Sequence, residues 1–248
     1  MNENYRHKRL LALLHRQKML STQDIIEQLK VSPATVRRDI NKLNELGLLK
    51  KVRNGAEYVN NSTINTEIRT LVYSEEKERI AKAAADMCKD DQSVLITCGS
   101  TMMLLGQQLC GRKIQILTNY VSLANYLIEQ KHKDLGIMGG QYNAEKDITI
   151  SFSPDYNYYY AANIMFTSGR GFTEEGLFKT DMIIANSEKQ MAAKSDRYVV
   201  LLDSSKLGNK VGMLFTRIDE IDTLITGQEA DPQIIQKLRD KGLKIILA

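Results

Sequence analysis

Cysteine is scarce in this 248-residue chain, and the few cysteines are poorly placed for disulfide or metal chemistry. Cys88, Cys98 and Cys110 are odd in number, form no Cys-x-x-Cys pair and have no histidine partner nearby. This pattern argues against a disulfide framework and a structural zinc site, and it favours reduced thiols in the cytosol. The sequence therefore predicts a cytoplasmic protein that holds neither a metal nor a cofactor.

Long hydrophobic runs are also missing. No apolar stretch approaches the roughly 20 residues of a membrane span, and the N-terminal sequence MNENYRHKRLL lacks the apolar core and cleavage site of a signal peptide. Apolar residues make up 43% of the chain and charged residues 26%, which is ordinary for a globular protein with a sizeable core. We expect neither a membrane span nor a cleaved leader.

Positive charge is concentrated near the start of the chain. Residues 1–60 hold twelve Lys or Arg and six Asp or Glu, whereas the remaining residues hold 22 basic and 24 acidic ones. The first part therefore carries +6 and the rest −2, although the whole chain is only +4. This indicates a small basic module that meets a polyanion such as nucleic acid. The alternative is an ordinary solvated basic surface.

The basic part has the pattern of a helix-turn-helix. A helix is expected over 6–16, and Ser21 is placed to cap a second helix with an apolar face. After a short break, Ser32 and Pro33 have the residue types of an N-cap and a first helical position. The third helix buries apolar residues spaced i, i+4 and i+7, so its opposite face is polar. Two short helices with a tight break are typical of DNA-binding helix-turn-helix proteins.

A two-stranded wing is predicted after these helices. The segments 48–52 and 56–59 flank Arg53-Asn54-Gly55, and Asn-Gly is a strong hairpin signal because both residues tolerate positive φ. Charge, caps and hairpin come from different residues and agree, so DNA binding is favoured over a helical protein-interaction domain. The DNA-binding candidates are Ser32, Pro33, Ala34, Thr35, Arg37, Arg38, Asn41, Lys42 and Arg53.

These residues resemble a known family. The run VSPATVRRDINKLNELGLLKKVRNGA (31–56) is similar to the DeoR pattern V-S-x-x-T-I-R-R-D-L-x-x-L-E-x-x-G-x-L-x-R-x-x-G-G-A, with Arg37 and Arg38 at the paired arginines. The resemblance implies a winged helix-turn-helix domain, with the helix-turn-helix over 20–39, in a family composed mostly of repressors of sugar-catabolism operons. Asn54 stands where most members carry the first glycine of the wing, which changes the turn chemistry and not the layout.

The rest of the chain has the pattern of an α/β domain. Residues 59–74 are polar and without a clear period, which predicts a linker between a DNA-binding domain over 1–58 and a larger domain over 75–248. In that domain short apolar strands alternate with helices, as in a mostly parallel sheet covered on both faces. Helices are expected over 75–88, 101–110, 121–130 and 181–193 and from 232, and strands over 93–97, 114–117, 135–138, 164–166, 199–202, 223–225 and 243–247.

Polar or small residues follow five of these strands, and ligands of parallel sheets bind beyond the carboxyl ends of the strands. Gly99-Ser100-Thr101, before a helix, offers backbone N–H groups and hydroxyls to a phosphate. The plain alternative is that glycine and serine make good turns, that Asp203 caps a turn and that the lysines are only solvated. The effector-binding candidates are Gly99, Ser100, Thr101, Thr118, Asn119, Gly139, Gly140, Glu175, Lys179, Asp203 and Lys206.

The DeoR resemblance extends over nearly the whole chain. It implies that the larger domain is a sensor of a phosphorylated sugar, with a fold similar to ribose 5-phosphate isomerase. Five stretches closely resemble a subgroup of the family that controls L-ascorbate utilisation. They are 98–111, 116–128, 137–143, 165–182 and 201–215. That closer resemblance implies L-ascorbate 6-phosphate as the inducer that releases the protein from its operator.

An isomerase-type enzyme is the competing hypothesis, because the candidate set contains carboxylates and lysines that could act on a sugar phosphate. The Asp-Gly-x-Asp element of the isomerases is missing, since the chain has no Asp-Gly dipeptide, and fold similarity alone does not transfer activity. One helix-turn-helix reads few base pairs, so we expect a homodimer or homotetramer on double-stranded operator DNA. The aromatic run Tyr156, Tyr158, Tyr159 and Tyr160 fits either an oligomer contact or a lid.

Overall fold

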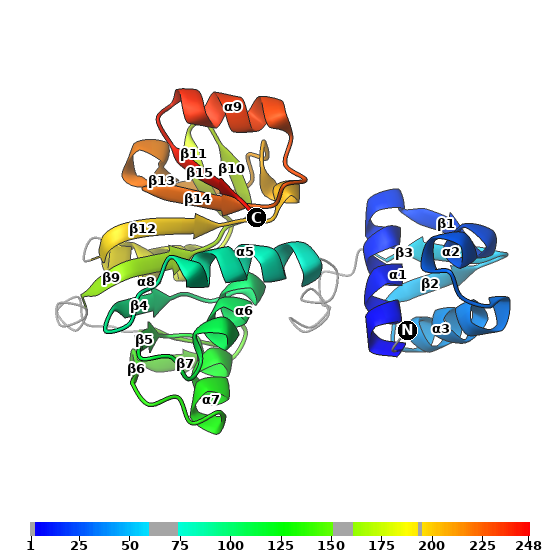
Figure 1. The fold of residues 1–248 in the computed structure, drawn as a ribbon, viewed down its shortest axis with the longest axis horizontal. Coiled ribbons are helices and arrows are strands. Elements are labelled where there is room, and N and C mark those ends of the chain that lie inside the picture. The colour runs from blue at the N-terminus through cyan, green and yellow to red at the C-terminus, as the bar shows by residue number, and fades with distance from the viewer. Residues whose placement is uncertain (1–2, 60–73, 151–160, 193–194) are drawn as a thin grey trace. The chain divides into compact units, whose positions relative to one another are not determined.

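The computed structural model describes residues 3–59, 74–150, 161–192 and 195–248 (Figure 1). The chain divides into two compact units, Met1–Ser74 and Glu75–Ala248. Most of the predicted linker over 59–74, and the tyrosine run over 156–160, lie outside the described residues. No helix in the described ranges combines the length and the apolar character that crossing a membrane requires.

The first unit packs three helices against a small antiparallel sheet. Its elements are α1 (Glu3–Gln17), β1 (Met19–Ser21), α2 (Thr22–Leu29), α3 (Pro33–Glu45), β2 (Leu49–Val52) and β3 (Gly55–Tyr58). The predicted helix starts are confirmed, because Ser21 and Asp24 form a reciprocal capping box and the Ser32 hydroxyl accepts from the Thr35 N–H. Strand β1 is not predicted by the sequence pattern; it pairs with β3, which gives the order β1-β3-β2.

The wing turn differs from the prediction in one respect. Asn54 takes the left-handed conformation, with φ of 66°, as expected of a turn residue. Gly55 is instead the first residue of β3, where it pairs with Val52, and its φ is not positive. A Cβ on Gly55 would lie 2.2 Å from the carbonyl oxygen of Leu20 in β1. Glycine is therefore needed here for the close approach of two strands, and the prediction that Gly55 serves the turn is wrong.

The second unit is built on a seven-stranded sheet whose neighbouring strands are all parallel. The strands, in the order β15-β14-β12-β9-β4-β5-β6, are Lys244–Leu247, Thr223–Thr226, Ser195–Leu201, Ala162–Thr167, Ser93–Ile96, Gln115–Thr118 and Leu135–Ile137. Its helices are α5 (Ser74–Asp86), α6 (Ser100–Leu109), α7 (Val121–Glu129), α8 (Met182–Ala192) and α9 (Pro232–Asp240). The predicted parallel sheet is confirmed, with element ends that shift by a few residues.

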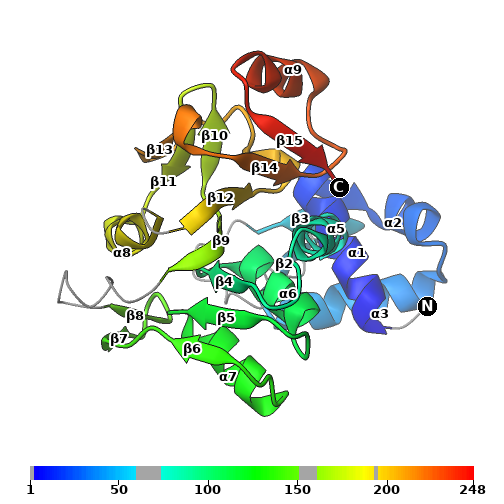
Figure 2. The same cartoon turned by 60° about the vertical axis from the view of Figure 1, so that its left-hand side comes forward.

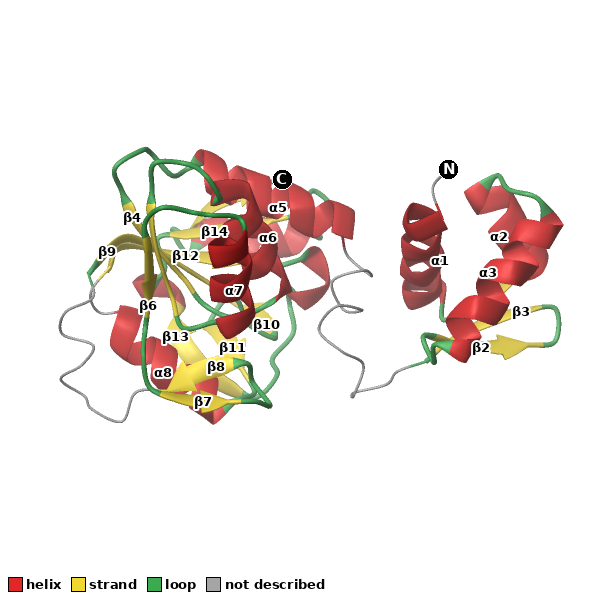
Figure 3. Ribbon diagram, turned by 90° about the horizontal axis from the view of Figure 1, so that it is seen from below, coloured by secondary structure: helices red, strands yellow, loops and turns green. Residues whose placement is uncertain are grey.

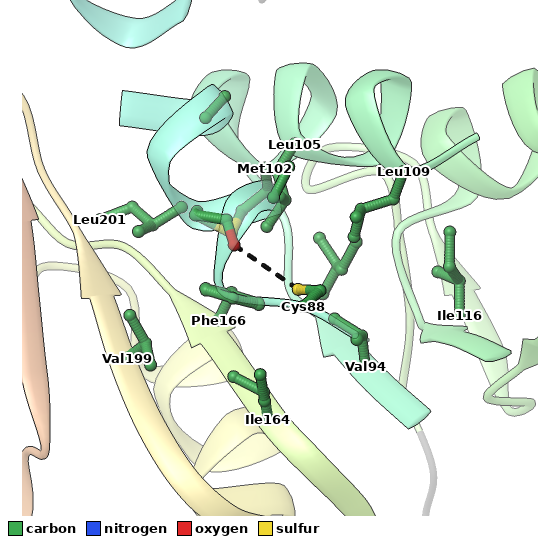
Figure 4. Close-up of a cluster of buried hydrophobic side chains, with 14 of the residues drawn as sticks. Cys88, Val94, Met102, Leu105, Leu109, Ile116, Ile164, Phe166, Val199 and Leu201 are labelled. Carbon is green, nitrogen blue, oxygen red and sulfur yellow. Dashed lines mark hydrogen bonds between the residues drawn. The ribbon is translucent and has the colours of Figure 1, made fainter. Parts of the chain in front are cut away.

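Alternate residues of each strand point to opposite faces, and both faces are buried. One face packs against α5, α6 and α7, and Figure 4 shows its core, in which Val94, Ile164 and Val199 of the sheet belong to one buried cluster with side chains of α6. The other face packs against α8 and α9 through residues such as Leu95 and Val200. Figure 2, which views the sheet nearly along its plane, shows α5 and α8 on opposite sides of it. This two-sided burial explains why the strands are continuously apolar in sequence.

Short antiparallel strands and two 3-10 turns complete the second unit. The sequence pattern predicts none of these strands, and it gives a turn capped by Asp203 only as the alternative role of that residue. The strands and turns are β7 (Gln141–Asn143), β8 (Ile148–Ile150), β10 (Gly171–Thr173), β11 (Gly176–Lys179), β13 (Met213–Arg217), η2 (Ser204–Lys206) and η3 (Ile218–Glu220). Strands β10, β11 and β13 form one antiparallel sheet, and β7 and β8 form a separate pair (Figure 3). The small sheet brings the end of β11 to the carboxyl end of β9, where the Lys179 ammonium donates to the Thr167 hydroxyl at 2.9 Å.

Candidate functional site

The polar face of α3 is the first candidate surface. Its apolar face is buried, as predicted, through Val36, Ile40 and Leu43. Arg37 and Arg38 are exposed in the first two turns of α3, and neither forms an ion pair or a hydrogen bond within the described part of the chain. Both guanidinium groups can therefore reach an external acceptor, a base edge or a phosphate oxygen.

The other candidates on α3 have distinct positions. Pro33, Ala34, Asn41 and Lys42 are exposed along the same helix. Ser32 is exposed too, but its hydroxyl caps the helix and lies 2.8 Å from the hydroxyl of half-buried Thr35. These two hydroxyls are therefore engaged in starting the helix, which leaves Arg37 and Arg38 as the side chains of α3 best placed for an outside partner.

A buried ion cluster fixes α3 on α1. Asp39 is 2% exposed and accepts from the Arg6 guanidinium at 2.8 Å and from His7 Nε2 at 2.9 Å. Burial by itself would raise the pKa of Asp39, but the hydrogen bonds from Arg6 and His7 outweigh it and hold that pKa below its ordinary value. Asp39 is not among the residues predicted to be functional, although a carboxylate among apolar helix positions is a signal that the sequence contains.

The wing lies against α3 through a lysine. The Lys51 ammonium donates to Asn41 Oδ1 at 2.8 Å, and the Lys51 N–H donates to Asn44 Oδ1 at 2.8 Å. Arg53 is exposed at the tip of the hairpin, and within the described residues it makes no hydrogen bond or ion pair. Helix face and wing thus form one basic surface of the kind that meets the groove and backbone of duplex DNA.

The carboxyl edge of the parallel sheet is the second candidate site. Gly99 precedes α6 with a φ of 136°, a conformation that favours glycine, and no side chain caps the helix there. Ser100 is half-buried at the helix start and Thr101 is buried. The first N–H groups of α6 therefore lie at the end of β4 without a capping side chain, as in sites that bind phosphate.

Asp203, just after β12, is the most unusual polar group at this edge. It is 1% exposed, and among the described residues its Oδ2 has no hydrogen-bond partner, although the ammonium groups of Lys206 and Lys77 lie 3.4 and 3.8 Å away. Burial would raise the pKa of Asp203, but the charges of Lys206 and Lys77 outweigh it and hold that pKa below its ordinary value. A buried, charged carboxylate whose Oδ2 makes ion pairs but accepts no hydrogen bond is suited to a donor such as a sugar hydroxyl.

Two residues outside the predicted set belong to this cluster. Lys77 and Glu76 come from the first turn of α5, and both are buried. Glu76 Oε1 accepts from the N–H of Ser204 at 2.6 Å, and burial raises the pKa of Glu76. Their only sequence signal is charge at the start of a helix, which ordinarily indicates a solvated turn.

The candidates after β5 and β6 have structural partners. The buried Thr118 hydroxyl donates to the Ile96 carbonyl at 2.7 Å, and the Asn119 amide donates to the Thr149 carbonyl at 3.1 Å and to the Ser187 hydroxyl at 3.2 Å. Gly139 is half-buried and Gly140 is exposed with a φ of 146°. The side chains of Thr118 and Asn119 thus hold the strand ends together, whichever ligand binds there.

Lys179 and Glu175 lie at opposite ends of β11. Lys179 is buried, and its ammonium lies 2.5 Å from Glu188 Oε2 of α8. Glu175 is at the β10–β11 turn, is about half exposed and pairs with Lys210 at 2.7 Å. The structure therefore brings Lys179 to the strand ends and leaves Glu175 away from them.

Comparisons with known proteins give the family. The DeoR-like helix-turn-helix domain matches residues 6–62, and the DeoR C terminal sensor domain matches residues 73–228. The "HTH-type transcriptional regulator UlaR" of Escherichia coli O1:K1 / APEC is 49% identical over 99% of both chains, as is its namesake from Shigella boydii serotype 18. Among solved structures, ribose 5-phosphate isomerase A from Methanocaldococcus jannaschii matches 56% of each chain, with 20% identity and a TM-score of 0.41.

A winged helix-turn-helix joined to an α/β sensor unit defines a DNA-binding transcriptional regulator. The chain belongs to the DeoR family. This assignment confirms the predicted family and decides between regulator and enzyme, because the relatives that match over the whole length are named as transcriptional regulators.

Proposed function

We propose that this regulator is a repressor of a sugar-catabolism operon, that of L-ascorbate utilisation, and that L-ascorbate 6-phosphate releases it from its operator. Support for the subgroup comes from the five stretches that resemble regulators of L-ascorbate utilisation. Three of these stretches contain Gly99-Ser100-Thr101, Asn119 and Asp203-Lys206, which lie at the ends of parallel strands.

The chemical class of the effector is inferred from two different groups that lie at the same edge of the sheet, a helix start and a carboxylate. The start of α6 offers uncapped N–H groups, which suit a phosphate. Asp203 offers a buried carboxylate oxygen that accepts no hydrogen bond from the part of the chain that the structure describes and that lies 3.4 Å from the Lys206 ammonium. A phosphorylated polyol supplies both an anion and hydroxyl donors, whereas inorganic phosphate supplies no sugar hydroxyls.

The remaining assignments belong to the same proposal. The DNA-contacting residues are Arg37, Arg38, Asn41, Lys42 and Arg53, with Ser32, Pro33, Ala34 and Thr35 at the start of α3. The protein acts in the cytoplasm as a homodimer or homotetramer, because two helix-turn-helix units on one near-palindromic site give useful specificity. The boundaries are 1–58 for DNA binding, 59–74 for the linker and 75–248 for the sensor.

Titration of operator DNA tests the proposal. L-Ascorbate 6-phosphate should weaken operator binding by the roughly 5–150-fold of a typical allosteric coupling of ~1–3 kcal/mol, and linkage requires operator to weaken effector binding by the same factor. Unphosphorylated ascorbate and inorganic phosphate are the controls. Equal operator affinity in all conditions would overturn the inducer assignment and leave DNA binding standing.

A further inference from the structure

Helix α8 carries a carboxylate into the buried end of the sheet. Glu188 is 2% exposed, and its Oε2 lies 2.5 Å from the Lys179 ammonium and 2.5 Å from the Thr167 hydroxyl, which donates to it. Lys179 also donates to the Thr167 hydroxyl at 2.9 Å and lies 4.5 Å from the Phe215 ring centre. The three polar side chains satisfy one another inside an apolar surrounding.

This cluster lies next to the strand end that leads to the α6 loop. The Thr97 hydroxyl, the last group before Cys98, donates to that of Thr167 at 3.5 Å. Cys98 directly precedes Gly99, and its thiol is close enough to respond to the charges of Glu188 and Lys179. Burial raises the pKa of Cys98 to about 12, so the thiol stays neutral. The carboxylate oxygen Oε2 of Glu188, at 2.5 Å, is the ion-pair partner of the Lys179 ammonium.

A second residue of α8 engages a second effector candidate. Ser187, which precedes Glu188, accepts the hydrogen bond from Asn119 Nδ2 at 3.2 Å. Two consecutive residues of α8 thus accept hydrogen bonds from Lys179, at the end of β11, and from Asn119, which follows β5. Helix α8 contributes an anion and a hydroxyl, the two chemical groups that a sugar phosphate also contributes.

We propose that α8 is an internal competitor of the effector. In the arrangement described here, Glu188 and Ser187 fill positions that an anionic sugar phosphate takes when it binds, and the effector displaces α8 from Lys179. This inference rests on the proposed function, because it needs an anionic effector at the carboxyl edge of the sheet. A buried lysine requires a counter-charge, and carboxylate and phosphate are alternative partners for it.

The proposal gives α8 two discrete positions, which is what a ligand-controlled switch requires. An effector that replaces Glu188 binds only the form in which α8 has moved, so it shifts the population toward that form. The apparent affinity for the effector is then reduced by the small fraction of molecules in which α8 has already left. Weakening the hold of α8 should therefore tighten effector binding, whereas removing an ordinary structural contact would not.

Hydrogen exchange of the wild-type chain is the first test. With L-ascorbate 6-phosphate bound, amides in 182–192 should exchange faster, while those of β4 and β9 should exchange at the same rate or more slowly. Unchanged or slower exchange in α8 would overturn the competition. The measurement needs no variant, so it stands even if substitutions at the buried pair impair folding.

Binding of the same effector to variants is the second test. Glu188→Gln should bind it about tenfold more tightly, since a neutral amide holds Lys179 less firmly and the competent population rises accordingly. Asp222→Asn is the matched control, because that exposed carboxylate accepts from the Tyr198 N–H at 2.6 Å near the opposite, amino edge of the sheet. Its affinity should equal that of the wild type.

The double variant Lys179→Gln/Glu188→Gln removes both charges and should bind the effector more weakly than Glu188→Gln alone. Equal affinity of these two variants, or unaltered or weaker binding by Glu188→Gln, would overturn the inference. If the wild type binds the effector and releases operator while α8 shows none of these effects, only the inference fails. If the wild type binds no L-ascorbate 6-phosphate, the proposed function fails and the inference with it.

Discussion

Replacing Asp39 by asparagine should destabilise the winged-helix unit and weaken operator binding with it. Asp39 is the carboxylate by which α3 is held on α1, through Arg6 and His7. Asparagine has nearly the same shape but no charge, and its amide nitrogen cannot accept a hydrogen bond. The variant therefore removes the counter-charge of Arg6 without opening a cavity.

The magnitude follows from burial. Removing one partner of a buried ion pair costs about 3–5 kcal/mol, because the remaining charge stays out of water. Arg6 is 12% exposed, and both Arg6 and His7 have contacts besides Asp39. We therefore expect a smaller loss of unfolding free energy, about 2–3 kcal/mol, which is about 8–24 °C in melting temperature for a unit of this size.

Native-state hydrogen exchange of α1 and α3 amides in the full chain measures this loss unit by unit. Asp24→Asn is the control, because the Asp24 carboxylate belongs to an exposed capping box, so its loss should destabilise the unit less than the loss of the buried Asp39 carboxylate. If Asp39→Asn exchanges like the wild type, or like Asp24→Asn, the buried cluster does not hold α3 and the reasoning is refuted.

The pH dependence of the unfolding free energy tests the same prediction independently. The pKa of Asp39 is lowered in the folded unit, so its contribution is complete above the ordinary Asp pKa of about 3.9 and is lost as pH falls through the folded value. The stability difference between wild type and Asp39→Asn should therefore be constant near neutral pH and shrink in acid. A difference that persists unchanged at low pH would point to packing instead of charge.

Three further predictions concern single positions. If the arginine reads a base, Arg37→Ala and Arg38→Ala should each cost ~1–3 kcal/mol of operator binding. If it contacts a phosphate, the variant should weaken binding to operator and to random duplex alike, and the slope of binding against salt should fall by about 1. Unchanged affinity for both DNAs would contradict the placement of α3. Gly55→Ala should destabilise the wing by about 1–3 kcal/mol, because its Cβ meets the Leu20 carbonyl, whereas Asn54→Gly, at a φ of 66°, should be neutral or slightly stabilising by thermal melting. Lys206→Ala and Ser100→Ala should abolish release of operator by L-ascorbate 6-phosphate while leaving effector-free operator affinity intact; release as in the wild type would exclude both residues from the site.

Local signals in the sequence were sufficient for most of the secondary structure. Ser21, Ser32 and Pro33 begin helices because side-chain oxygens and a fixed φ satisfy the first turn wherever it lies. The strands of the large sheet are continuously apolar because both of their faces are covered. These are properties of a few neighbouring residues, so the sequence predicts the winged helix-turn-helix and the parallel sheet directly.

Close approach and burial could not be predicted in this way. Asn-Gly is a turn signal, so the sequence predicts Gly55 in the turn. Only the pairing of β1 with β3 shows that a Cβ on Gly55 would clash with the carbonyl oxygen of Leu20. The short strands β10, β11 and β13 escaped prediction because three or four residues carry little periodicity. Their pairing depends on contacts between distant segments.

The charged residues of the sensor unit show most clearly what the sequence determines and what only the tertiary structure decides. Sequence alone determined which residue types follow the strands, and so it predicted Gly99, Ser100, Asp203 and Lys206 as one sheet-edge group. Only the tertiary structure decided that Lys179 pairs with Glu188, that Lys77 stands beside Asp203 and that Glu175 lies elsewhere. The physical reason is that a charge acquires its role from burial and from its partner, and both are set by segments far apart in the chain.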